Sequence, residues 1–90
     1  MILENDTITE IIKDTGWLLK GKSIIKTFKF EAFMEAISFV NAVADLAEEV
    51  NHHPDIEILY TRVKINLSTH SEGGVTDKDI SLSVAIDEVV

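Results

Sequence analysis

Three histidines lie between Glu48 and Asp79, in a stretch that also contains the only proline of the chain. Imidazole is the side-chain group that titrates nearest neutral pH, so His52, His53 and His70 can act as general acids and bases. Together they could protonate a departing oxygen or accept a proton from a bound substrate. We therefore predict that the three histidines converge on one site.

A carboxylate stands one helical turn before the first histidine. Glu48 precedes His52 by four residues, so on a helix its carboxylate could orient the ring and stabilise the charged form. Pro54 disfavours the α conformation at His53, so we expect the helix to end there, where its carbonyl pole favours an imidazolium. An alternative fits these residues equally well: His52 only caps the helix, and Glu48 is a solvated charge.

The remaining chain predicts a scaffold of alternating helices and strands. Residues 31–51 repeat apolar side chains with a helical period, whereas Met34, Phe39 and Leu46 lie off that face and could meet a second subunit. Residues 56–67 alternate like a strand, with Leu59 among the inward residues. One long strand and two short strands both remain open for this segment, since no Gly or Asn pair marks a tight turn.

The predicted fold class is α+β, in the order α-β-β-α-β(-β)-α. We expect an antiparallel sheet with the helices packed on one face. Thr76 opens the last helix, and Asp79 three residues later completes a capping box, which is a structural reason for that carboxylate. The other predicted elements are a helix over 8–14 with a Thr7–Glu10 capping box, and a hairpin of strands over 17–19 and 24–30.

Composition limits the classes of function. With 90 residues, of which 46% are apolar, the chain should form one domain over residues 1–90. A formal charge of −8 opposes binding to nucleic acid and to anionic membranes. No apolar run approaches the ~20 residues of a membrane helix, and the start of the chain has no secretory pattern, so we expect a cytoplasmic protein.

Thiol chemistry is excluded because the chain has no cysteine. A metal site is a weaker alternative, since the adjacent residues His52 and His53 would point about 100° apart on a helix. Trp17 has the large apolar area of a core or interface anchor, and a place in a pocket wall stays open for it.

The spacing of these residues resembles the signature of the pterin-4a-carbinolamine dehydratase family. Three residues separate Glu48 from the His52-His53-Pro54 triplet, five residues follow before Tyr60, nine before His70 and eight before Asp79. The likeness also includes Gly16-Trp17, the phenylalanines at 28, 30 and 33, and the LSTH segment at 67–70. It covers residues 16–87.

This resemblance implies four antiparallel strands with three helices, and a homodimer or homotetramer. It implies dehydration of 4a-hydroxytetrahydrobiopterin to quinonoid dihydrobiopterin and water, as in tetrahydrobiopterin recycling, without metal or cofactor. His52 and His70 would be the acid/base pair, with Glu48 and Asp79 orienting them. The substrate-binding residues implied are His53, Pro54, Tyr60, Ser68, Thr69 and Trp17.

Two other functions stay open. Members of the family also act as dimerisation cofactors of a homeodomain transcription factor, so the chain could be a non-catalytic interaction module with a transcription factor or a hydroxylase as partner. The second alternative is a structural domain whose histidines have no catalytic role.

Overall fold

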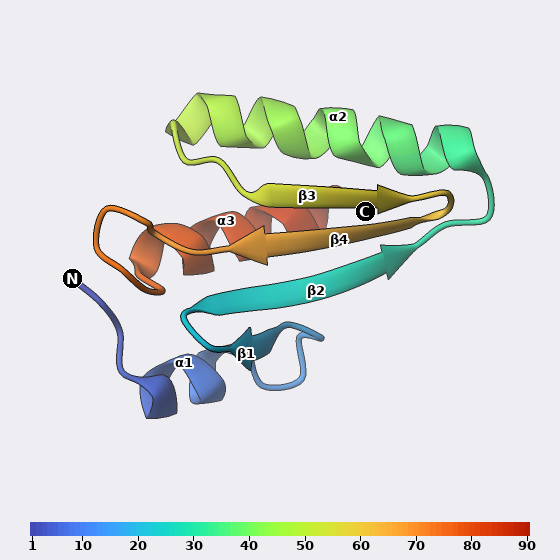
Figure 1. The fold of residues 1–90 in the computed structure, drawn as a ribbon. Helices are drawn as coiled ribbons and strands as arrows, with labels where there is room; N and C mark the ends of the chain where they lie inside the picture. Colours follow the sequence, from blue (N-terminus) through green and yellow to red (C-terminus); the bar gives the residue numbers. More distant parts are fainter.

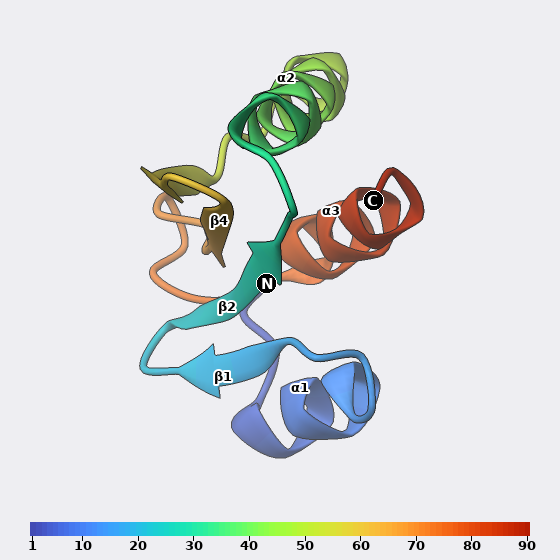
Figure 2. The ribbon, with the colours of Figure 1, turned by 90° about the vertical axis from the view of Figure 1, so that its right-hand side faces the viewer.

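The computed structural model describes residues 1–90 as one four-stranded sheet with three helices. Neighbouring strands are antiparallel in the order β1-β2-β4-β3. All three helices lie on the same side of the sheet (Figures 1 and 2). The predicted fold class and element order are therefore confirmed. The elements are α1 Asn5–Ile12, β1 Leu18–Lys20, β2 Ser23–Lys29, α2 Phe33–Val50, β3 Asp55–Leu59, β4 Arg62–Leu67 and α3 Asp77–Glu88.

The extended segment forms two strands rather than one. Tyr60 takes a left-handed conformation with φ of 55°, and the chain reverses there between β3 and β4. Ile56 and Ile58 pair with core residues of β4, so they share the inner face. Leu59 therefore points the other way and is 59% exposed. The prediction that Leu59 faces the core was wrong, because a single alternation was extended across the turn.

The core fills the space between the inner face of the sheet and the helices. Ile24 of β2, Ile65 of β4 and Ile86 of α3 are fully buried there. The rings of Phe28 and Phe39 have centroids 4.7 Å apart, which joins α2 to the sheet through an aromatic contact. None of the helices combines the length and the apolar character that a membrane crossing requires.

The outer face predicted for α2 needs correction. Phe39 is only 4% exposed and belongs to the core, and Leu46 packs against it. Met34 alone of the three predicted residues stays largely exposed, at 67%. The helix is covered on two sides, by β4 and by α3, so its buried face is wider than one stripe of the sequence suggested.

Helix ends decide where the site residues lie. Residue Asn51 is left-handed with φ of 52°, and the backbone N–H of His52 donates to the carbonyl of Ala47 at 3.0 Å. This αL ending, rather than Pro54, stops α2 and leaves both histidines outside the helix. The first helix also differs from the prediction: it begins at Asn5, so Thr7 lies inside it and makes no cap.

Candidate functional site

Antiparallel pairing of β3 with β4 assembles the site. Asp55, the first residue of β3, pairs with Asn66 near the end of β4. The segment that precedes β3 and the segment that follows β4 therefore leave the sheet at the same end. His52, His53 and His70 consequently line one polar pocket of about 290 Å³, which agrees with the predicted convergence of the three histidines.

The imidazole of His52 is held by a buried carboxylate. Its Nε2 lies 2.6 Å from Oδ1 of Asp79, and the side chains are 13% and 0% exposed. Asp79 completes the predicted capping box, since its Oδ2 accepts the N–H of Thr76 at 2.9 Å. One carboxylate therefore caps α3 and also orients the histidine.

Glu48 contacts a different histidine from the one predicted. Its Oε2 pairs with Nε2 of His53, on the exposed surface. The expected contact between Glu48 and His52 assumed that the helix continues through both residues. Because Asn51 is left-handed, the chain leaves the helical path after α2. His52 therefore contacts Asp79, and His53 lies beside Glu48.

The pocket lining is free of carboxylates. Although the chain has 16 acidic residues, none contributes to this lining. Lys78, in the first turn of α3, is a basic residue that lines the pocket. It was not predicted from the sequence. Its position next to Asp79 was the only sequence feature that could have indicated a place at the site. Such a lining suits an electron-rich substrate. The lining residues are Asn51, His52, His53, Ser68, Thr69, His70, Ser71 and Lys78.

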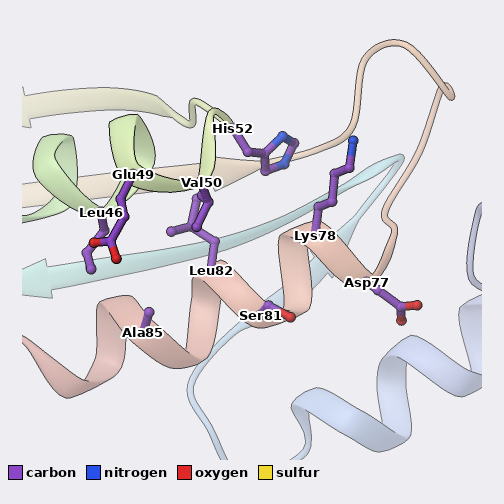
Figure 3. Close-up of a pocket in the computed structure, with 9 residues that line it drawn as sticks. All are labelled: Leu46, Glu49, Val50, His52, Asp77, Lys78, Ser81, Leu82 and Ala85. Carbon is purple, nitrogen blue, oxygen red and sulfur yellow. The ribbon is translucent and has the colours of Figure 1, made fainter.

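A second, more apolar groove adjoins this pocket. It has a volume of about 440 Å³ and runs between α2 and α3, with Leu46 and Leu82 in its wall. His52 and Lys78 line both the groove and the polar pocket. Figure 3 shows these two side chains together at one end of the groove. His52 thus stands at the boundary between a polar and an apolar surface.

Three of the predicted substrate-binding residues line the polar pocket, namely His53, Ser68 and Thr69. Ser68 lines it, and its hydroxyl donates to the carbonyl of Lys22 at 2.7 Å. Thr69 lines it as well but is only 3% exposed, with its hydroxyl bonded to Asp79. Pro54 follows His53 and is half-buried, but it does not line the pocket.

Trp17 and Tyr60 are not brought to the histidines within one chain. Trp17 is buried, and its indole N–H donates to the carboxylate of Asp87 at 3.0 Å, eight residues beyond Asp79 along α3. Eight helical residues correspond to about 12 Å. Tyr60 lies in the β3–β4 turn, at the opposite end of these strands, and stacks on Phe33.

No group of three or more His, Asp and Glu side chains is arranged to hold a metal ion. The fold and the pocket define a small α+β protein in which three imidazoles line a polar pocket and carboxylates outside the lining hold two of them.

Comparison with known proteins shows the family to which a protein with this fold and pocket belongs. The family model described as pterin 4 alpha carbinolamine dehydratase matches residues 1–89. A protein of Prochlorococcus marinus is 46% identical over 90 residues, covering 100% of this chain and 95% of its own length. One of Sulfurisphaera tokodaii is 45% identical, covering 99% and 96%. Both names assign these proteins provisionally to pterin-4-alpha-carbinolamine dehydratase.

Solved structures show the same fold. A transcriptional coactivator/pterin dehydratase from Brucella melitensis superposes with a TM-score of 0.93 at 34% identity, covering 99% of this chain and 98% of that one. A pterin dehydratase-like protein, identified as a RuBisCO assembly factor in the alpha-carboxysome, shares the fold with a TM-score of 0.67 at 24% identity, covering 81% and 84%. The chain belongs to the pterin-4a-carbinolamine dehydratase family.

Proposed function

We propose that this protein is a dehydratase that converts 4a-hydroxytetrahydrobiopterin to quinonoid dihydrobiopterin and water, in tetrahydrobiopterin recycling. The observation that carries the proposal is the meeting of three imidazoles in one pocket free of carboxylates. Family membership supports the choice of substrate. The reaction moves protons and breaks a C–O bond with no change of oxidation state overall, so imidazoles are sufficient and no metal is needed.

The proton balance assigns the roles. The C4a–O bond breaks, the departing oxygen gains a proton and leaves as water, and N5 loses its proton to complete the quinonoid double bond. His52 or His70 donates the first proton, and the other histidine or a water molecule accepts the second. Proton exchange with solvent then returns both histidines to their starting protonation states. His52 can act through Nδ1, because Asp79 engages its Nε2.

A coupled assay tests the proposed function. With an aromatic amino acid hydroxylase supplying the substrate, the purified protein should accelerate formation of the quinonoid dihydropterin above the spontaneous rate. Equal rates with and without the protein would contradict the enzyme proposal and would favour the non-catalytic interaction module.

We expect His53 to contribute to binding rather than to proton transfer. His53→Ala should raise KM and leave kcat nearly unchanged, because contacts common to the ground and transition states change only KM. Glu48→Gln should raise KM in the same way but by less than about fivefold, since an exposed ion pair contributes roughly 0–1 kcal/mol.

Steady-state kinetics measures both variants. Glu49→Gln is the matched control, because Glu49 is the neighbouring carboxylate and lines the apolar groove instead of the polar pocket. A fall in kcat for Glu48→Gln with KM unchanged would show that Glu48 acts through His52, as the sequence alone predicted.

We also propose that the protein acts in the cytoplasm as a homodimer or homotetramer. Phe33, Met34 and Tyr60 are large apolar or aromatic side chains that remain exposed near one end of α2. Association would remove such a surface from water.

A further inference from the structure

Thr69 connects the two histidines proposed to transfer protons. Its side chain reaches the partner of His52, because the hydroxyl donates to Oδ2 of Asp79 at 2.8 Å. Its backbone holds the loop that begins with His70: its N–H donates to the carbonyl of Gly74 at 2.9 Å, and its carbonyl accepts the N–H of Gly73 at 2.9 Å. One buried residue is thus hydrogen-bonded both to the carboxylate that contacts His52 and to the loop that contains His70.

The hydrogen-bond directions around Thr69 follow from counting protons. A hydroxyl has one hydrogen, and that of Thr69 goes to Asp79. The second contact of the hydroxyl, 2.7 Å to Oγ1 of Thr76, must therefore be donated by Thr76. Both threonines are 3% exposed, and no buried side-chain nitrogen or oxygen lacks a partner. The chain of donors runs from Thr76 through Thr69 to the carboxylate.

This arrangement also determines which nitrogen of His52 is free. Oδ2 of Asp79 accepts from Thr69 and from the N–H of Thr76, and a carboxylate has no hydrogen of its own to donate. Oδ1 then accepts from Nε2 of His52, at 2.6 Å. In the neutral ring the proton therefore sits on Nε2, and Nδ1 keeps its lone pair for the pocket.

We infer that Thr69 is a positioning residue that sets His52 in the Nε2–H tautomer and places His70 opposite it. The catalytic consequence rests on the proposed dehydratase function, whereas the proton arrangement does not. The resemblance implied that Thr69 binds substrate, but its hydroxyl is already committed to Asp79. Thr69 should therefore influence kcat through the histidines rather than KM through a contact with the pterin.

Thr69→Val removes the hydroxyl with little change of volume, and Thr69→Ser keeps it. We expect Thr69→Val to lower kcat about tenfold with KM nearly unchanged, the lower end of what loss of an orienting partner costs at functional sites. Thr69→Ser should retain most of the activity. Thr27→Val, an exposed β2 position outside both pockets, is the matched control and should behave like the unmodified protein. Unchanged kcat in Thr69→Val, or a rise in KM alone, would overturn the inference.

Nitrogen-15 NMR of the histidine rings provides a readout that needs no turnover. The neutral His52 ring of the unmodified protein should carry its proton on Nε2, and in Thr69→Val this proton should exchange faster with water. A proton on Nδ1 in the unmodified protein would overturn the inference even if Thr69→Val failed to fold. The expected tautomer in a protein without dehydratase activity would support the proton arrangement while the proposed function failed.

Discussion

Replacement of both His52 and His70 should lower kcat of the proposed dehydration by about 10²–10⁴-fold, the range that a positioned acid or base contributes. Both side chains line the polar pocket, so each can partly replace the other as proton donor. His52→Ala and His70→Ala should therefore each keep partial turnover. The double variant should lose more than either single variant, because water is then the only proton donor.

His52→Ala carries a separate risk for folding, since it leaves the buried carboxylate of Asp79 without one partner. His52→Gln is the matched variant, because a glutamine amide can donate to Asp79 but cannot transfer a proton as imidazole does. The His52→Gln/His70→Gln pair should reproduce the loss of activity. If this double variant, folded by circular dichroism, kept the original kcat, the proton chemistry proposed for the two histidines would have to be abandoned.

Loss of the Asp79 carboxylate should have the largest effect on stability. Asp79 is 0% exposed and accepts from His52, Thr69 and the backbone of Thr76. Asp79→Ala removes the cap of α3 and leaves buried donors unpaired, for a total of about 3 kcal/mol of unfolding free energy. Urea denaturation at constant pH measures the change.

Asp77→Asn is the matched control for Asp79→Ala. Asp77 lies in the same first turn of α3 but is exposed. Its carboxylate interacts only with the helix dipole, so we expect a loss of about 0.3–1 kcal/mol. Equal stability of the two variants would show that the buried carboxylate adds nothing beyond its charge at the helix end.

Asp79 contributes to stability and also contacts His52, so an Asp79 variant can lose activity through unfolding or through a misplaced imidazole. The activities of the unmodified protein and of Asp79→Asn should therefore be compared at a temperature where both proteins are folded. Under that condition Asp79→Asn should still reduce kcat, because a neutral amide stabilises an imidazolium less than a carboxylate does.

Much of the scaffold could be predicted because local patterns specify it. Alternation and turn residues predicted the hairpin of β1 and β2, the helical period predicted α2, and the Thr76–Asp79 spacing predicted the capping box, which the structure contains. These features depend on residues a few positions apart. The signature of the three histidines was also visible in the sequence, and it led to the family that the comparisons show.

The partners of the histidines depended on the tertiary structure. A contact four residues along a helix predicted Glu48 beside His52, but the left-handed Asn51 redirected the chain. The contact between His52 and Asp79 joins residues 27 positions apart in the sequence. It requires β3, β4 and α3 to meet at one end of the sheet. Phe39 likewise lies in the core because α3 covers a side of α2 that the helical period of the sequence does not mark as buried. Contacts between distant segments arise from packing of the whole chain, so local sequence patterns determine the elements but not which side chains meet.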